Sequence, residues 1–361
     1  MSTTEGIALD RDTIARVDVS DQLTDILAIP EHLRDALWKV ESAGLEPWDS
    51  PGGIIVAGMG GSAIGGELAR AILGDHASRP LITARAYGLP PWTTNETTVV
   101  CASYTGNTEE TLTCYEAAGV IGARRVVVTA GGELAEMARA DKVPVIPLAG
   151  GYQPRAAVAY LTVAVLEVAA LAGVGPRMNS EIDVAADHLE ELVIEWGPDG
   201  VDAGEAKSLA RALNGTVPMI AGAGLTTAIA YRWKTQINEN AKSPAYAQEL
   251  PELDHNEIEG WTSTGEFGRF SAVFLDDDDT HPRVKERMEL TSRLIRPGAA
   301  GVHRVRSRGR TTVERVFSLV LLGDLVSLYL AVLRGIDPEP VELLSALKAE
   351  LGRRDEAPAR D

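Results

Sequence analysis

Cysteine is nearly absent from the sequence, which limits the ways in which the fold can be held together. The chain has two cysteines, Cys101 inside an apolar run and Cys114 in a helical pattern. Two such thiols do not form the disulfide framework of a small secreted domain, and they suit a reducing compartment. The first residues, MSTTEGIALDRDTIARVDVS, also lack the basic start and apolar core of a secretory signal. We therefore expect a cytoplasmic protein in which both thiols are packing groups.

Positive charge is scarce as well. The 34 Lys and Arg residues face 52 Asp and Glu residues, which gives a formal net charge of −18. A surface of this sign repels polyanions, and this argues against broad contacts with nucleic acid or acidic membranes. An anionic ligand must therefore be bound locally, by groups gathered at one site.

Two common signatures of ligand binding are missing. The sequence has no Gly-x-x-x-x-Gly-Lys-Ser/Thr segment, which disfavours nucleotide hydrolysis through a P-loop. Its six histidines are scattered and form neither His-x-x-x-His nor His-Glu-x-x-His, which argues against a zinc site. The sequence therefore implies no metal and no cofactor.

Long apolar runs are limited to two stretches, Ala156–Gly173 and Val316–Leu333. Each approaches the length that crosses a membrane, but Glu167 and Asp324 lie near their centres, where a charge in lipid is costly. Helices that are apolar on all sides are typical of elements sandwiched between layers or subunits. We interpret both stretches as buried helices of a protein that does not enter the membrane.

What is present is the alternation of an α/β protein. At 361 residues, 45% of them hydrophobic, the chain is long enough for two domains of ~100–200 residues each. Short β-rich runs alternate with helical segments, an order typical of a doubly wound, mostly parallel sheet. The expected strands are Ile54–Ala57, Leu81–Ala84, Thr98–Ala102, Arg125–Thr129, Val143–Ile146, Ala272–Leu275 and Gly301–Val305. The expected helices are Ser62–Leu73, Asn107–Ala118, Glu133–Arg139, Ala156–Leu171, Glu181–Trp196, Pro282–Leu294, Val313–Leu333 and Val341–Leu351.

The second half of the chain repeats the opening of the first. An apolar strand, a Gly-x-Gly and a hydroxyl residue that opens a helix occur at Ile55–Ser62 and again at Met219–Thr226. Such self-similarity predicts two halves with one fold. We divide the chain into residues 1–175, with a helical N-terminal extension, and residues 176–361, with C-terminal helices. The charged tail Arg353–Asp361 is expected to be loose.

The first Gly-rich segment, Gly58-Met-Gly-Gly-Ser-Ala-Ile-Gly-Gly66, follows a strand and opens a helix. Glycines let the backbone approach a ligand closely, and a helix N-terminus offers N–H groups and a positive dipole end to an anion. Phosphate is the anion that such a turn is expected to bind. The segment also satisfies the dinucleotide fingerprint, but the second strand ends at Arg85 instead of an acidic residue. A tight turn without a ligand is the third interpretation.

A second turn strengthens the phosphate interpretation. Ser103-Tyr104-Thr105-Gly106-Asn107-Thr108 follows the strand Thr98–Ala102 and opens another helix. A capping box of Asn107 with Glu110 explains those two residues without any ligand, but it leaves three hydroxyls unexplained. Two hydroxyl-rich turns at adjacent strand ends can hold the three oxygens of a phosphate monoester without a lysine.

These segments give the chain a resemblance to a known family. From about Gly53 to Leu351 it resembles the sugar isomerase (SIS) fold, and within it the bifunctional phosphoglucose/phosphomannose isomerases of archaea and actinobacteria. The markers appear in the family's order: GMGGSAIGG, SYTGNTEET, GYQPRAA, NENAKSPAYAQELPELDHNEI and a last helix with a lysine. The resemblance implies two tandem SIS domains, a homodimer and an aldose–ketose isomerase that interconverts hexose 6-phosphates through a cis-enediol.

The resemblance also implies four catalytic residues. The proton-moving base is expected at Glu239 in Asn-Glu-Asn-Ala-Lys, because one carboxylate must serve both C1 and C2. The ring-opening histidine is expected at His255, reaching the site from the neighbouring subunit, since imidazole titrates near neutral pH. Arg155 would stabilise the enediolate charge, and Lys348 would help to open the ring. Without a catalytic role, Glu239 would be a charge at a helix end and His255 a surface or core histidine. Arg155 would be an ordinary loop arginine and Lys348 an exposed helical lysine.

The substrate phosphate is then expected at Gly61, Ser62, Ser103, Tyr104, Thr105 and Thr108. The substrates would be glucose 6-phosphate and fructose 6-phosphate, together with mannose 6-phosphate. Bifunctional members place a small hydroxyl residue between two prolines where this chain has Pro338-Glu339-Pro340, so the balance between the two aldoses stays open. Two other classes also stay open: a regulatory SIS protein that senses a phosphosugar without turning it over, and a nicotinamide-dependent oxidoreductase.

Overall fold

The computed structural model describes residues 6–355, with side chains as far as Leu351, and contains two separate parallel sheets. The first has the order β2-β1-β3-β4-β5 and places β1 and β3 next to each other. Their carboxyl ends therefore meet at one edge, where parallel α/β sheets bind ligands. Its strands are β1 Ile54–Ala57, β2 Leu81–Ala84, β3 Thr98–Ala102, β4 Arg124–Thr129 and β5 Val145–Pro147.

The second sheet repeats this topology with one strand fewer, in the order β7-β6-β8-β9. All its pairings are parallel, so β6 corresponds to β1, β7 to β2, β8 to β3 and β9 to β4. Its strands are β6 Val217–Gly222, β7 Tyr246–Glu249, β8 Phe270–Asp276 and β9 Gly301–Arg306. The repeat that the sequence predicts, and with it the α/β class with two doubly wound sheets, is confirmed.

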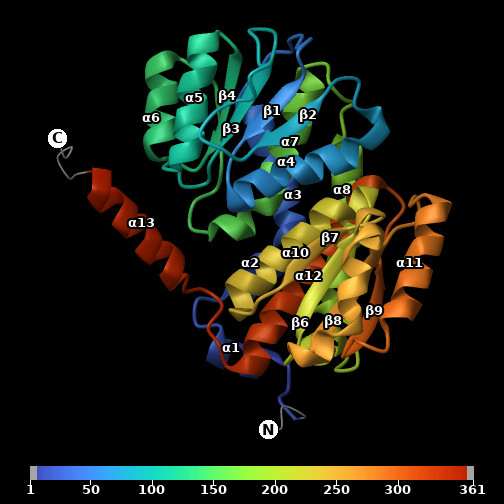
Figure 1. The fold of residues 1–361 in the computed structure, drawn as a ribbon. Helices are drawn as coiled ribbons and strands as arrows, with labels where there is room; N and C mark the ends of the chain where they lie inside the picture. Colours follow the sequence, from blue (N-terminus) through green and yellow to red (C-terminus); the bar gives the residue numbers. More distant parts are fainter. Residues whose placement is uncertain (1–5, 356–361) are drawn as a thin grey trace.

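Helices surround both sheets and fill the space between them (Figure 1). The helix α4 follows β1 and contacts α10, which follows β6, so the two halves meet along the elements that carry the glycine-rich turns. The α-helices are α1 Arg11–Val17, α2 Gln22–Leu27, α3 Ile29–Ser42, α4 Gly60–Leu73, α5 Glu109–Ile121, α6 Gly132–Asp141, α7 Val158–Leu171, α8 Asn179–Trp196, α9 Glu205–Leu213, α10 Thr227–Ala241, α11 Pro282–Ile295, α12 Thr312–Arg334 and α13 Glu342–Asp355.

The two long apolar helices are core elements. Windows in Pro154–Leu171 and Thr312–Arg334 are apolar enough to cross a membrane, yet 83% and 100% of them are buried inside the protein. α7 packs against α3 and α4, and α12 packs against α8, α9 and α10. Both helices are thus covered within one chain, and their apolarity gives no argument for a partner subunit.

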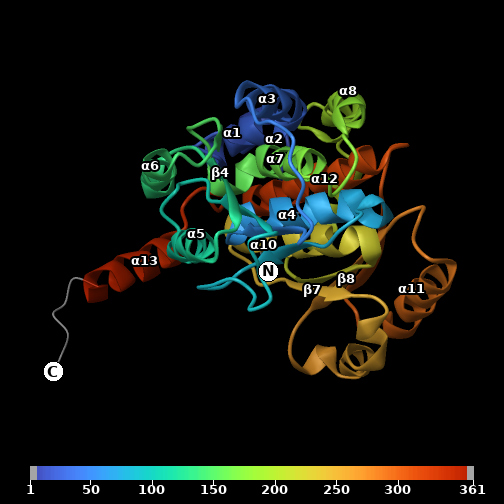
Figure 2. The same cartoon turned by 90° about the horizontal axis from the view of Figure 1, so that it is seen from above.

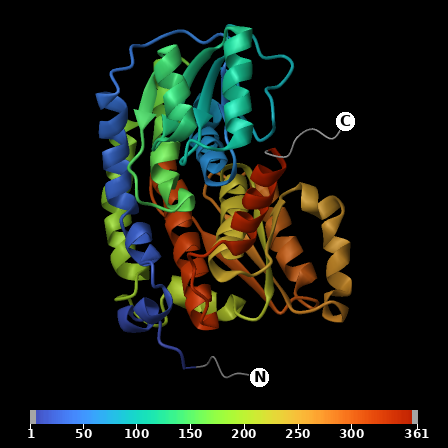
Figure 3. The same ribbon diagram turned by 90° about the vertical axis from the view of Figure 1, so that its left-hand side faces the viewer.

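The N-terminal helices join the two halves. α3 runs along α7 and α8, and α1 and α2 contact α12 of the second half (Figure 3). Because these contacts cross the predicted boundary at residues 175/176, that division of the chain stays a prediction.

Several local expectations change. Asn107 and Glu110 form no capping box, because α5 begins at Glu109 and the Asn107 side chain accepts from the Glu133 N–H at 3.0 Å instead. The last helix continues to Asp355, so the first residues of the tail expected to be loose are helical, while 356–361 lie outside the described residues. The sequence reading also missed β7 and α9, two short elements rich in polar residues.

Candidate functional site

The turn between β1 and α4 is built for close approach. Gly58 lies against the Ala102 carbonyl of β3, where an added Cβ would come within 2.8 Å, and Gly60 has φ +51°. α4 then begins without a side-chain cap, which leaves its positive end to a ligand. Ser62 is buried in the first turn of α4, and its Oγ accepts from the Tyr104 N–H at 3.2 Å.

The turn after β3 gathers the predicted hydroxyls. Ser103 Oγ and Thr108 Oγ1 are 2.9 Å apart, and the Gly106 N–H donates to Ser103 Oγ at 3.1 Å. Thr105 is exposed, and its hydroxyl accepts from the Asn107 N–H at 3.3 Å. One hydroxyl of the Ser103–Thr108 pair donates to the other, so the second O–H of the pair and that of Thr105 remain available to an anion.

Tyr104 differs from its neighbours because its polar groups serve the fold. Its hydroxyl donates to the Ala149 carbonyl at 3.1 Å and accepts from the Tyr152 N–H at 2.8 Å. Burial raises the pKa of this phenol, so it stays neutral. Tyr104 therefore stabilises the segment that leads to Arg155. Its hydroxyl is already paired, so the residues around Tyr104 would have to bind the phosphate in its place.

The two predicted phosphate turns, Gly58–Ser62 and Ser103–Thr108, adjoin the predicted catalytic residues Arg155 and Glu239. Gly61 packs on the backbone of Pro154 and Arg155, where an added Cβ would lie 2.8 Å from the Pro154 oxygen. Arg155 is 4% exposed, and its Nη1 lies 3.5 Å from Oε2 of Glu239. The structure therefore brings the predicted site residues of the first half together with Glu239, which comes from α10 of the second half.

The guanidinium of Arg155 is held firmly by its other nitrogen. Nη2 donates to Gln22 Oε1 and to the Pro338 carbonyl, each at 2.9 Å. Burial lowers the pKa of Arg155, and the carboxylates of Glu239 and Glu339 counteract the shift. Arginine has so high an ordinary pKa that the group remains a cation at neutral pH.

Further charges surround this pair. Lys242 donates to the carbonyls of Glu239 and Pro338, the latter at 2.8 Å, and burial lowers its pKa, with nearby Arg155 adding to the effect. Burial raises the pKa of Asp25 to about 6, and repulsion from Asp21 and Asp18 adds to that shift while Arg155 opposes it. The site therefore contains one carboxyl group, that of Asp25, whose pKa is raised to about 6 beside a fixed cation.

Glu239 lines a cleft of about 840 Å³ between the C-terminal half of α10 and the start of α13. The carboxylate is 31% exposed, so it is open to a ligand. Leu343 and Leu344 form the α13 wall of this cleft. Lys348 is exposed four residues after Leu344, on the same face of the helix and one turn beyond the cleft.

His255 lies apart from these residues. It ends the short 3₁₀ helix Glu252–His255 that follows β7, and its side chain is exposed. None of the hydrogen bonds or ion pairs among residues 6–351 joins His255 to Glu239 or Arg155. A single chain thus presents His255 on its surface and Glu239 in its cleft.

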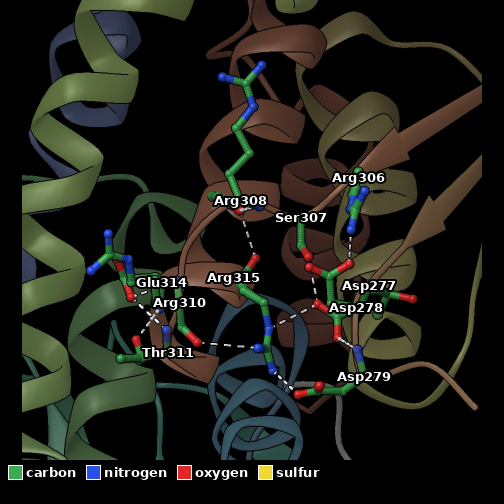
Figure 4. A network of polar contacts seen from close by, with 12 residues as sticks. Asp277, Asp278, Asp279, Arg306, Ser307, Arg308, Arg310, Thr311, Glu314 and Arg315 are labelled. Carbon is green, nitrogen blue, oxygen red and sulfur yellow. Dashed lines mark hydrogen bonds and ion pairs between the residues drawn. The ribbon is translucent and has the colours of Figure 1, made fainter.

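The turn after β8, which corresponds to the hydroxyl turn after β3, carries Asp277, Asp278 and Asp279 (Figure 4). Asp277 is 1% exposed, forms an ion pair with Arg315 at 3.1 Å and accepts from the Ser307 hydroxyl at 2.6 Å. Arg315 also pairs with Asp279, and Arg306 pairs with Asp278. This turn is filled by its own ion pairs and would repel a phosphate.

Two residues near Arg155, Gln22 and Lys242, were not predicted as site residues, and Glu339 was noted only for its place between two prolines. Lys242 and Glu339 stand in segments already singled out, so their neighbourhood was a usable signal. Gln22 lies far from every motif, and no local pattern marks it. Arg85, the candidate dinucleotide reader, lies 3.6 Å from Glu67 and stacks on the Tyr231 ring at 5.1 Å.

The two parallel sheets, the hydroxyl turns and the Arg155–Glu239 pair define a phosphosugar-binding protein of the SIS class. Residues 202–351 match the family model described as the bacterial phospho-glucose isomerase C-terminal SIS domain. A glucose-6-phosphate isomerase like protein from Thermus thermophilus shares the fold at a TM-score of 0.60 and 20% identity, over 95% of this chain and 99% of that one.

Curated relatives narrow the class to a family. A bifunctional phosphoglucose/phosphomannose isomerase of Caldicellulosiruptor bescii is 40% identical, over 82% of this chain and 89% of the relative. One of Aquifex aeolicus is 35% identical, over 87% and 94%. The chain belongs to the bifunctional phosphoglucose/phosphomannose isomerase family.

Proposed function

We propose that this protein is an aldose–ketose isomerase that interconverts glucose 6-phosphate and mannose 6-phosphate with fructose 6-phosphate. The observation that carries the proposal is the pairing of Glu239 with the buried Arg155 at the edge of an open cleft, next to two anion-binding turns. The relatives from Caldicellulosiruptor bescii and Aquifex aeolicus, both phosphoglucose/phosphomannose isomerases by name, agree with this chemistry. Free, buried cysteines suit action in the cytoplasm.

The chemistry assigned to Glu239 is a proton transfer between neighbouring carbons. Its carboxylate removes the proton from C2 of the open-chain aldose, the C–H electron pair forms the C1–C2 double bond, and the electrons of the C1 carbonyl move to O1. The O2 proton passes to O1 within this cis-enediolate. The carboxylic acid then returns the proton to C1, which leaves the ketone at C2. Arg155 stabilises the negative charge that develops on the enediolate oxygens, an effect worth a few kcal/mol when the cation is fixed beforehand.

In this proposal the phosphate group anchors the sugar in the site. We place it at the start of α4, with the first-turn backbone at Gly61 and the hydroxyls of Ser62, Ser103, Thr105 and Thr108 as donors. The net charge of −18 makes such neutral, local donors the suitable way to bind a dianion without a broad basic surface.

Ring opening assigns two further residues. His255 of the partner subunit transfers a proton from the C1 hydroxyl to the ring oxygen, and Lys348 assists from the face of α13 that adjoins the cleft. This requires a homodimer. The support is the exposure of His255 and of an apolar stripe on α13, which projects from the body of the chain (Figure 2). The stripe consists of Leu343, Leu344, Leu347 and Leu351, which are 88%, 48%, 57% and 38% exposed.

Subunit mixing tests the shared site. Glu239→Gln and His255→Ala homodimers should each be inactive, whereas a hybrid retains one site with both native residues and should recover activity. Mass spectrometry of differently tagged subunits verifies the exchange. A verified hybrid without activity contradicts the shared site.

The function itself is tested by assaying the purified chain on both aldose phosphates, with fructose 6-phosphate as the measured product. Turnover of either aldose separates the enzyme from a phosphosugar-sensing regulatory protein, which would bind without turnover. Glu339 sets the balance between the two aldoses in this proposal, because its carboxylate accepts from Gln153 at 3.0 Å beside Arg155. A Glu339→Thr variant that leaves the ratio of the two rates unchanged would remove Glu339 from the account.

A further inference from the structure

Gln22 bridges the two halves of the site from a segment that precedes both sheets. It is the first residue of α2 and is 4% exposed. Its Oε1 accepts from Arg155 Nη2 at 2.9 Å, and its Nε2 donates to Asn240 Oδ1 at 3.0 Å. One amide thus contacts the arginine of the first half and the residue that follows Glu239 in the second half.

The orientation of this amide is determined by its partners. Asn240 is fully buried, and its Nδ2 donates to Ser327 Oγ at 2.8 Å, which leaves Oδ1 to accept from Gln22. Ser327 in turn donates to the Asp324 carbonyl at 2.7 Å in α12. With Asn240 fixed, Gln22 must turn its Nε2 toward α10 and its oxygen toward Arg155.

The backbone of α2 holds Gln22 in place as well. The N–H groups of Gln22 and Leu23 donate to the two carboxylate oxygens of Asp18, at 3.0 and 2.8 Å. Asp18 is 3% exposed, so this anchor is buried and geometrically defined. The backbone of Gln22 is therefore fixed by Asp18, and its side-chain amide is fixed by Arg155 and Asn240.

The contact with Gln22 helps to set the orientation of the Arg155 guanidinium. Its backbone carbonyl accepts from Arg232 at 3.1 Å, and Nη2 has two hydrogens, which Gln22 and the Pro338 carbonyl accept. The remaining terminal nitrogen, Nη1, then faces Glu239. The loss of Gln22 would leave one buried N–H of Arg155 without its acceptor, and the guanidinium would be held only by Glu239 and the carbonyls of Pro338 and Glu339.

We propose that Gln22 is a positioning residue that keeps the guanidinium of Arg155 directed at the carboxylate of Glu239, although the two residues belong to different halves. This inference rests on the proposed isomerase function. It predicts that Gln22 acts on the enolisation step and not on phosphate binding, because its contacts reach Arg155 and α10 but neither hydroxyl turn.

The test compares Gln22→Met, which keeps the length of the side chain without its amide, with Leu23→Ala on the same helix. Leu23 is 6% exposed in the core, so its variant loses side-chain packing but keeps every hydrogen bond of the bridge, including the backbone N–H that donates to Asp18. Gln22→Met should lower kcat ~10-fold or more and change KM less than ~3-fold, since small misplacements of catalytic groups are costly. The kinetic isotope effect of C2-deuterated glucose 6-phosphate should rise, because enolisation becomes more rate-limiting.

Leu23→Ala should lower the melting temperature but keep the parent's kcat and isotope effect at a temperature where it is folded. If Gln22→Met keeps both parent values, the positioning role is wrong. If it does not fold, Gln22→Glu carries the test, because it still accepts from Arg155 but cannot donate to Asn240, and it must show the same loss of kcat.

A readout independent of turnover separates this inference from the proposed function. Hydrogen exchange of the backbone amides in the last turn of α10, Ile237–Ala241, should accelerate in Gln22→Met and not in Leu23→Ala. A parent protein that turns over neither aldose phosphate overturns the proposed function. Unchanged exchange at this turn overturns the bridge itself.

Discussion

The turns after β3 and β8 occupy the same position in two sheets of the same topology, yet their chemistry is opposite. The first contains Ser103, Thr105 and Thr108, and the second contains the run Asp277–Asp279. The first turn presents O–H donors, while the second pairs its carboxylates with Arg306 and Arg315. The two halves thus share one fold, but only the first has a turn whose side chains suit an anion.

The difference indicates that the two halves contribute different groups to the proposed site. The first half supplies the phosphate turns and Arg155. The second half supplies Glu239 from α10, the helix that corresponds to α4, and fills its own phosphate position with ion pairs. Because α4 and α10 contact each other, the anion site of one half lies beside the carboxylate of the other.

The largest effect should come from giving the first turn the charge of the second. Thr105 is exposed, so Thr105→Asp should fold normally, yet it places a carboxylate at the proposed position of the phosphate dianion. Two like charges ~4 Å apart repel by about 4 kcal/mol at an effective dielectric constant of ~20. We expect kcat/KM to fall ~10²-fold or more, mainly through KM. Thr105→Asn is the matched control of equal shape, and a similar loss in that variant would show that charge is not the cause.

The reverse change concerns the second turn, where stability and not binding should suffer. Arg315→Met leaves Asp277 buried without its arginine, and removal of one partner from a buried pair is strongly destabilising. Since Ser307 still donates to Asp277, we expect a loss of about 2 kcal/mol in the free energy of unfolding, measured by urea titration. KM for fructose 6-phosphate should stay at the parent value. A raised KM would mean that the second turn takes part in binding.

The smallest effect should come from removing donors without adding charge. Ser103→Ala combined with Thr108→Ala should raise KM for fructose 6-phosphate about 10-fold with little change in kcat, because each neutral hydrogen bond contributes ~1 kcal/mol to both ground and transition states. Thr280→Ala, in the corresponding turn of the second half, is the control and should leave KM unchanged. An unchanged KM in the double variant places the phosphate elsewhere.

The sequence predicted what depends on local pattern. Apolar strands, the glycine turns at Gly58 and Gly222, and the two buried helices all follow from periodicity and spacing, and the structure confirms them. β7 was missed because it is a four-residue edge strand, Tyr246–Glu249, that carries Gln and Glu. Its place in the sheet is determined by its neighbour β6, and no local pattern reveals it.

The same distinction holds for the site. Glu239 and Arg155 stand in recognisable segments, and the structure places them 3.5 Å apart. Gln22 could not be found from the sequence, because its role arises from contacts with Arg155 and Asn240, more than a hundred residues away. Long-range polar contacts of this kind depend on tertiary packing, which a single sequence does not display.

The central claim is that the second half supplies the base. The most direct test is Glu239→Gln, which keeps the shape of the side chain but cannot accept the proton, assayed with glucose 6-phosphate labelled with tritium at C2. We predict that kcat falls ~10²-fold or more, that KM changes little, and that release of tritium to solvent falls in parallel. Near-parent turnover with tritium still exchanging into solvent would contradict the account.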